Sequence, residues 1–221
     1  MALETGLSVQ YGCGLDAPSS WVNFDNSPTL RFERLPIIGK LITRGTPLFP
    51  KNVRYGNIVS GLPLRPNSAD RLYASHVLEH LPKEAAIKAL ENSFRILRPG
   101  GIFRLIVPDL YVRVTRYTAA NNDGDPTAAD QFMIATGLGI ERQASSIMDR
   151  LSMIFGGSRH IWMWDERAMK KALENAGFNE IRRCSFGDSG DPHFTAVEHA
   201  GRFVDGPFVE LAMECRKPST A

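Results

Sequence analysis

The stretch that decides the fold lies near the start of the chain and reads Leu7-Ser8-Val9-Gln10-Tyr11-Gly12-Cys13-Gly14. It begins as a short apolar run rich in strand formers and ends at two glycines separated by one residue. Glycines directly after a strand indicate a tight backbone turn, or a close approach that leaves no room for a Cβ atom. A second apolar run, from Trp21 to Phe24, ends on Asp25. A carboxylate at the tip of a second strand can accept both hydroxyl groups of a ribose, so the two stretches together indicate a nucleotide-like ligand.

The composition is that of an ordinary globular protein with a substantial core. The chain has 221 residues, of which 43% are hydrophobic and 23% charged, and this length fits one large domain. A formal net charge of +2 without a polybasic tract argues against a dedicated nucleic-acid-binding protein. No apolar run approaches the roughly 20 residues that a membrane span requires. We therefore expect neither nucleic acid nor a membrane as a partner, and the sequence leaves the oligomeric state open.

The chain carries three cysteines, Cys13, Cys184 and Cys215. Their spacing fits no metal-binding motif, and an odd number of cysteines indicates a reduced compartment rather than a set of disulfides. The N-terminal residues also lack the basic segment and the apolar core of a signal peptide. We therefore expect a cytoplasmic protein.

Strand-like and helix-like patterns alternate along the chain, which is typical of an α/β fold with a mostly parallel sheet and helices on both faces. Apolar residues at helical spacing predict helices over residues 83–97 and 165–176, ended by Pro99 and Gly177 respectively. The loop between the first two strands is too short for a full crossover helix. Strands are expected at residues 7–11, 21–25, 53–58, 71–74, 102–108, 178–184 and 209–215.

Two long insertions interrupt this alternation within what we expect to be one domain over residues 1–221. Residues 28–54 contain four prolines and six basic residues against one acidic residue, which indicates either an irregular exposed excursion or a flap that faces an anionic substrate. Residues 111–158 have a mainly helical pattern and separate the fifth strand from the next core helix. Both insertions are candidate substrate lids.

Several local patterns, in order, resemble those of class I S-adenosylmethionine-dependent methyltransferases. Residues 9–14 resemble the glycine loop of that family, and Asp25 matches its ribose-binding acid. The run from Leu62 through Asp70 to Leu81 is similar to its Leu-Pro-Phe, Ser-Phe-Asp and Leu-Glu-His signature, and residues 97–101 resemble the turn before its fifth strand. The resemblance covers residues 7–110 well. It implies a Rossmann-like fold with a central sheet of seven strands and S-adenosylmethionine as the cofactor.

The resemblance also assigns the residues that hold the cofactor. The expected set is Gly12, Cys13, Gly14, Asp25, Asn57, Ile58 and His76. The family usually has an acid after its third strand, where this chain has Asn57-Ile58. An asparagine amide can still donate to or accept from the adenine edge.

Methyl transfer requires a positioned nucleophile and often a base, and histidine is the side chain best matched to neutral pH. The expected catalytic residues are His76, Asp109 and His160, each with a structural alternative. The alternative for His76 and His160 is a structural role, and the alternative for Asp109 is the N-cap of the following helix. Glu79 is interpreted as a structural hydrogen-bond partner rather than a base. Cys13 is interpreted as a small packed residue rather than a nucleophile, because no base lies beside it in sequence.

The remaining site residues are placed on the acceptor side. Tyr111, His80 and Trp162 are expected to contact the substrate, although Trp162 has a core position as its alternative. His76 and His80 have the i, i+4 spacing of two metal ligands, but the sequence offers no third ligand beside them, and no metal site is expected.

The function that follows is methylation of a small-molecule or glycan-type acceptor, most simply on oxygen. Two alternatives come from other classes. A non-catalytic S-adenosylmethionine-binding or interaction module would keep the fold without the chemistry. An NAD-dependent oxidoreductase is disfavoured by the missing third glycine and by the short first crossover.

Overall fold

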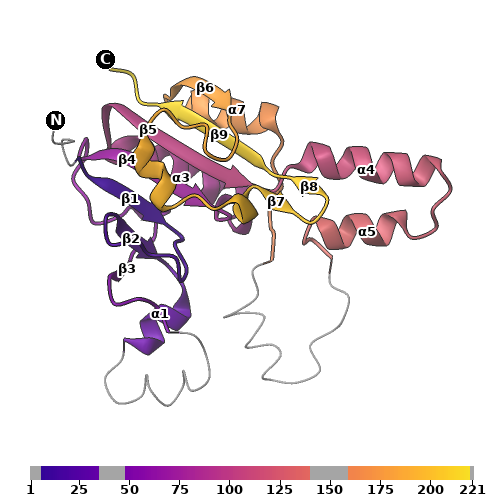
Figure 1. The fold of residues 1–221 in the computed structure, drawn as a ribbon, viewed down its shortest axis with the longest axis horizontal. Coiled ribbons are helices and arrows are strands. Elements are labelled where there is room, and N and C mark those ends of the chain that lie inside the picture. The colour runs from indigo at the N-terminus through magenta and orange to yellow at the C-terminus, as the bar shows by residue number, and fades with distance from the viewer. Residues whose placement is uncertain (1–5, 35–47, 140–158, 220–221) are drawn as a thin grey trace.

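The computed structural model describes residues 6–34, 48–139 and 159–219, which form a central seven-stranded sheet in the order β3-β2-β1-β4-β5-β9-β6 (Figure 1). The strands are β1 Ser8–Tyr11, β2 Val22–Asp25, β3 Val53–Tyr55, β4 Ala69–Ser75, β5 Leu97–Val107, β6 Asn179–Arg183 and β9 Leu211–Arg216. β1 to β5 are parallel, and β9 is antiparallel to both β5 and β6. The strand order reverses between β1 and β4, so a ligand site is expected outside the carboxyl ends of these two strands.

Helices cover the two faces of the sheet unequally. The α-helices are α1 Pro28–Glu33, α3 Lys83–Ile96, α4 Leu110–Asn122, α5 Ala128–Ala135 and α7 Glu166–Asn175. One face of the sheet packs against α3 and α7, which contribute buried residues such as Leu90 and Leu173 to the main core. The other face is covered by residues such as Phe194, Val197 and Phe203, which belong to a second core cluster.

The cover on this second face is built from short 3₁₀ turns rather than from long helices. These are η2 Pro192–Ala196 and η3 Ala200–Arg202, while a third turn, η1 Leu78–His80, follows β4. Residues 12–21, which the structure describes in full, contain no helix between β1 and β2, as the short loop predicted. The 192–203 segment therefore occupies a face that crossover helices usually cover.

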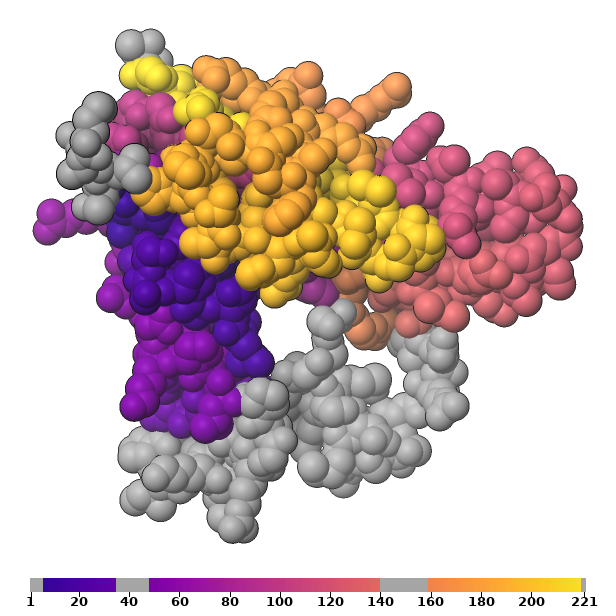
Figure 2. Space-filling view, viewed as in Figure 1, coloured from indigo at the N-terminus to yellow at the C-terminus, as the bar shows by residue number. Residues whose placement is uncertain are grey.

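The pair α4–α5 projects beyond the carboxyl end of β5 and forms an arm on one side of the molecule (Figures 1 and 2). A small antiparallel ribbon, β7 Val204–Asp205 and β8 Phe208–Val209, lies against α4. Of the two predicted insertions, residues 35–47 and 140–158 lie outside the described residues. The first insertion does contain a regular element, α1, whose N-cap Ser27 accepts a hydrogen bond from the Thr29 backbone at 3.2 Å.

The predicted strand limits need three corrections. β3 ends at Tyr55 rather than at residue 58, because the chain turns after Gly56. β5 begins at Leu97 rather than at residue 102, since Leu97 pairs with Ala69 and the Gly100 backbone donates to Lys217. The last strand begins after residue 209, which belongs instead to the β7–β8 ribbon.

A charged group is buried on the second face of the sheet. Arg104 of β5 has 1% of its surface exposed and contacts carboxylates of Glu198 and Glu214, each at 2.6 Å. The ion pair with Glu198 links the 192–203 segment to the centre of the sheet. Among the helices of the described ranges, none has both the length and the apolar character needed to cross a membrane.

Candidate active site

The glycine loop after β1 needs glycine at both of its predicted positions. Gly12 and Gly14 have φ angles of +66° and +56°, a region that other residues adopt only at a cost. A Cβ atom on Gly12 would overlap the Cγ2 methyl of Val77, whereas one on Gly14 would meet no described atom within 4 Å. The loop therefore packs directly on the residue after His76, and at Gly14 it faces open space.

Asp25 lies at the tip of β2, beside this loop, with 7% of its surface exposed. Its Oδ2 accepts from the Gly14 backbone at 2.9 Å and its Oδ1 accepts from the Ser27 backbone at 2.7 Å. Each carboxylate oxygen can accept a further hydrogen bond. Asp25 thus fixes the glycine loop and keeps acceptor capacity for a ligand hydroxyl group.

The other cofactor candidates contribute in different ways. The Cys13 side chain packs with Leu30 and Val53, and burial raises the pKa of its thiol to about 12, as suits a packed residue rather than a nucleophile. Asn57 uses its side-chain oxygen to accept from the Val59 backbone at 2.8 Å, so it caps the turn after β3. Ile58 is buried in the main core.

A narrow pocket lies at the carboxyl ends of β1 and β4. Its lining residues are Gln10, Tyr11, Gly12, Cys13, Asp16, Tyr73, Ser75, Val197 and Arg202. Residues 197–202 lie over this pocket, held by a hydrogen bond from His199 Nε2 to Asp16 Oδ2 at 2.7 Å. A second contact joins His76 Nε2 to the Arg202 carbonyl oxygen at 3.0 Å.

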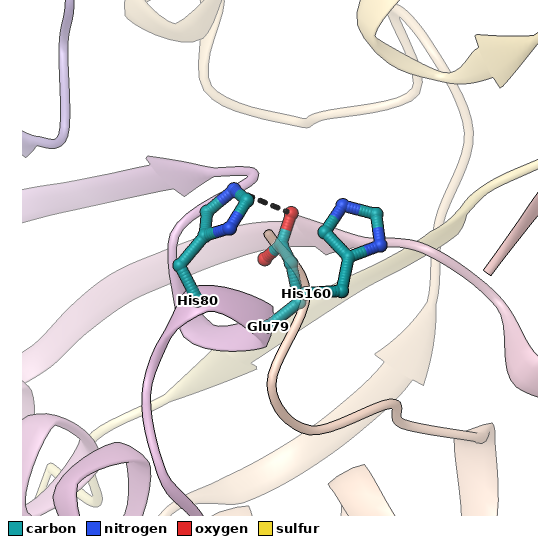
Figure 3. Close-up of side chains that lie close together, drawn as sticks. All are labelled: Glu79, His80 and His160. Carbon is teal, nitrogen blue, oxygen red and sulfur yellow. Dashed lines mark ion pairs between the residues drawn. The ribbon is translucent and has the colours of Figure 1, made fainter. Parts of the chain in front are cut away.

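Next to this pocket, the fold assembles a cluster of one carboxylate and three histidines. Figure 3 shows the Glu79 carboxylate between the rings of His80 and His160. One ligand atom from each of these residues lies within 4.8 Å of the others. His76 Nδ1 approaches Glu79 Oε1 to 3.2 Å, and His80 Nε2 lies 3.8 Å from the same oxygen. We define these four residues, Glu79, His76, His80 and His160, as the histidine cluster.

Backbone contacts bring His160 to the cluster from a distant part of the chain. The backbone N–H groups of Ile161 and Trp162 donate to the Glu79 carbonyl at 2.7 and 3.1 Å. His160 Nδ1 donates to the Thr136 carbonyl at 2.7 Å, and a Cβ on Gly137 would lie 2.7 Å from that nitrogen. The end of α5 thus seats the ring of His160.

The Glu79 side chain is fully buried and affects the pKa of the neighbouring His76. Burial lowers the pKa of His76, but the Glu79 carboxylate, whose Oε1 lies 3.2 Å from His76 Nδ1, opposes this effect. The net result is a pKa for His76 above the ordinary value. A histidine close to a buried carboxylate is thereby biased toward holding a proton.

Asp109, a predicted catalytic residue, has the contacts of its structural alternative. It is fully buried, and its Oδ1 accepts from the Tyr111 backbone at 2.9 Å as the N-cap of α4. Its Oδ2 forms an ion pair with Arg183 at 2.9 Å. Both oxygens therefore serve the fold.

The predicted acceptor-side aromatic residues lie on the surface. Tyr111 is 68% exposed and Trp162 is 39% exposed, with Lys83 Nζ 5.0 Å from the centroid of the Trp162 ring. Trp162 therefore does not have the core position that was its alternative. The nearby Trp164, which is 2% exposed, has a core position instead.

Sequence reasoning missed a cavity of about 460 Å³ in the projecting arm. Its lining comes from α4, α5 and the turn of the β7–β8 ribbon, and includes Tyr117, Phe132 and Phe208. Arg113 at its base is fully buried and pairs with Glu210 at 2.9 Å. The sequence feature that could have indicated this cavity is the apolar composition of residues 128–135. An isolated surface helix has a more polar sequence.

The comparison with a family of known sequences decides the identity. Residues 23–182 match the family model described as a methyltransferase domain. The chain belongs to this methyltransferase family. No curated protein matches it in sequence.

Solved structures of methyltransferases are similar to this chain at low sequence identity. A S-adenosylmethionine-dependent methyltransferase of Methanosarcina mazei is 14% identical, with a TM-score of 0.51 and coverage of 98% of this chain and 94% of that one. One of Archaeoglobus fulgidus is 15% identical, with a TM-score of 0.47 and coverage of 96% and 86%. The predicted family and its seven-stranded, mostly parallel Rossmann-like fold are confirmed.

The methyltransferase is S-adenosylmethionine-dependent, and its residues fit this cofactor. When bound, the cofactor supplies a methyl group on a positively charged sulfur. The glycine loop offers a surface without side chains at Gly14, and Asp25 offers buried carboxylate oxygens for hydroxyl groups. Both lie at the strand-order reversal between β1 and β4, where this class of fold binds ligands.

Proposed function

We propose that this methyltransferase methylates a hydroxyl oxygen of a small-molecule or glycan-type acceptor. The observation that carries the proposal is the histidine cluster beside the glycine loop. A hydroxyl group must lose its proton as it attacks, and this loss needs a base close to the reacting oxygen. His76 and His160 each direct a ring nitrogen toward the region around Glu79, where such an oxygen would bind.

The geometry supports a role for each residue in this proposal. Gly12, Gly14 and Asp25 hold the cofactor, with the backbone of Cys13 completing the loop. His76 lies between cofactor and acceptor, because Val77 packs on Gly12 while His76 faces Glu79. Asn57 and Ile58 would approach the adenine through the turn after β3. We do not keep Asp109 as a catalytic residue, since its oxygens are engaged.

The acceptor side lies between the cluster and the arm. His80 belongs to the cluster, and Tyr111 and Trp162 are exposed residues that a bulky acceptor would contact. The arm cavity is close by along the chain: the Ala135 carbonyl accepts from Arg113 in the cavity, and the neighbouring Thr136 carbonyl accepts from His160. A sugar ring or aromatic group fits a space of about 460 Å³.

Calorimetric titration with S-adenosylhomocysteine, with NAD as the control ligand, tests the cofactor assignment first. Binding of the first alone supports the assignment, and binding of NAD alone would restore the oxidoreductase alternative. The purified protein is then incubated with S-adenosylmethionine carrying a ¹³C-methyl group and with matched panels of sugars, alcohols and amines.

The chemical shift of the transferred methyl group distinguishes an O-methyl from an N-methyl product. An O-methyl product supports the proposal, and an N-methyl product would overturn it. Binding of S-adenosylhomocysteine without transfer to any acceptor would favour the non-catalytic module. We also propose a cytoplasmic location, because all three cysteines are free and buried, as suits a reducing compartment.

A further inference from the structure

Glu79 is a buried carboxylate that has no hydrogen-bond donor among the described residues. Its side chain is fully buried, and neither carboxylate oxygen has a hydrogen-bond partner among the described residues. His76 Nδ1 lies 3.2 Å from Oε1 but makes no hydrogen bond to it. A buried, ionised carboxylate without donors is strongly unfavourable, so a positive group belongs beside it.

The histidine rings are oriented so that they do not supply this group in their neutral form. His76 Nε2, His80 Nδ1 and His160 Nδ1 each contact a backbone carbonyl oxygen, at 3.0, 2.9 and 2.7 Å. A carbonyl oxygen only accepts, so each of these nitrogens carries the hydrogen. In a neutral imidazole the other nitrogen then has only a lone pair to offer.

The donor set is therefore the imidazole lone pairs of His80 and His160 and the carboxylate of Glu79, with ligand atoms within 4.8 Å of one another. A metal-ligating histidine typically donates its second ring N–H to a carbonyl or carboxylate, which fixes its tautomer and direction, and all three histidines here do so. We propose that the histidine cluster binds a divalent transition-metal ion, with Glu79, His80 and His160 as its three protein ligands and a further position open.

The donor chemistry selects the class of metal. Imidazole nitrogen suits zinc and its first-row neighbours, whereas magnesium and calcium prefer sites made wholly of oxygen. Two histidines and one glutamate form a known catalytic zinc set with an open position. Ligands at about 2.1 Å from one ion lie about 3.4 Å apart. The present limit of 4.8 Å thus requires a modest closure, which partly exposed rings such as His80 and His160 can make.

The sequence did not predict this site because its third ligand, His160, is distant along the chain from Glu79 and His80. His76 and His80 alone gave no basis for expecting a metal. The backbone hydrogen bonds from Ile161 and Trp162 to Glu79 bring His160 into range. A carboxylate between two ligating histidines then completes the set.

The consequence for catalysis rests on the proposed function. A divalent ion lowers the pKa of a hydroxyl group bound to it, and the proton leaves to water. An acceptor hydroxyl held in the open position would gain nucleophilicity beside the glycine loop. The cluster would then both orient the acceptor oxygen and ease its deprotonation.

The test is binding of Zn²⁺ to the full chain after treatment with a chelator and its removal. We expect one Zn²⁺ per chain by calorimetry and by elemental analysis, and no comparable binding of Mg²⁺. His160→Asn and His80→Asn should each weaken Zn²⁺ binding by about tenfold or more. Glu79→Gln should abolish it. His193→Asn, which removes a histidine paired with Asp191 outside the cluster, is the matched control and should bind Zn²⁺ like the wild type.

Titration with S-adenosylhomocysteine in the absence of metal separates the two proposals. Retained S-adenosylhomocysteine binding by the His160→Asn and His80→Asn variants shows that these variants are folded. They therefore test the metal site even if Glu79→Gln fails to fold. Wild-type protein that binds S-adenosylhomocysteine but not one Zn²⁺ would overturn the metal site alone. Zn²⁺ binding that survives both histidine substitutions, or that His193→Asn reduces equally, would also overturn it. Loss of S-adenosylhomocysteine binding in the wild type would count against the proposed function instead.

Discussion

Alanine at the two loop glycines should have unequal effects on stability. Both residues have positive φ, so each Ala substitution incurs about 1–2 kcal/mol of left-handed backbone strain. The change in the unfolded chain is the same for both and cancels in the comparison. Only the Cβ at Gly12 overlaps a neighbour, the Val77 methyl, and overpacking of this kind costs about 1–3 kcal/mol. We expect Gly12→Ala to lower the free energy of unfolding by about 2–5 kcal/mol, and Gly14→Ala by about 1–2 kcal/mol.

Urea denaturation followed by circular dichroism measures both values under one set of conditions. A double-mutant cycle with Val77→Ala isolates the steric part, because Ala at 77 removes the Cγ2 methyl that the new Cβ would meet. The coupling free energy should be about 1–3 kcal/mol in the direction of rescue. Equal destabilisation by the two glycine substitutions, or a cycle without coupling, would refute the packing of the loop on Val77.

Three further predictions concern separate parts of the molecule. Asp25→Ala should weaken S-adenosylhomocysteine binding by about 1–3 kcal/mol through lost charge-assisted hydrogen bonds, and unchanged affinity in calorimetry would remove Asp25 from the site. Asp165→Ala should lower the free energy of unfolding by about 1 kcal/mol, because Asp165 accepts from the first turn of α7 at 2.8 Å; denaturant melts check this, and no loss would contradict the cap. The thiols should react slowly with a disulfide reagent at pH 8, since burial raises the pKa of Cys13 and Cys184 to about 12 and that of Cys215 well above its ordinary value; rapid labelling of the folded protein would contradict their burial.

Local sequence signals predicted the elements that local physics controls. The glycine loop, the acid at the end of β2 and the helix over residues 83–97 follow from turn chemistry and periodicity, and all three lie where expected. The start of β5 could not be predicted from local sequence, because Pro99 and the two glycines after it normally end regular structure. Pairing of this segment with β4 and with Lys217 overrides that local preference.

The candidate site divides in the same way. Gly12 and Gly14 directly follow β1 and Asp25 ends β2, so their positions could be predicted from neighbouring residues. The contact of His160 with Glu79 depends on backbone hydrogen bonds between segments far apart in sequence, and no local pattern encodes it. Asp109 had two predictions, and its contact with Arg183 on β6 fits the structural one.

The cover formed by residues 197–202 has a consequence for the kinetics of ligand entry. If a ligand enters the pocket between β1 and β4 beneath this cover, we expect the contacts of His199 with Asp16 and of His76 with Arg202 to open first. The observed affinity is then reduced by the fraction of molecules that are open at a given moment. At high ligand concentration the observed association rate should reach a plateau equal to the opening rate. Opening of the cover, rather than diffusion, would then limit the rate of ligand entry in each turnover.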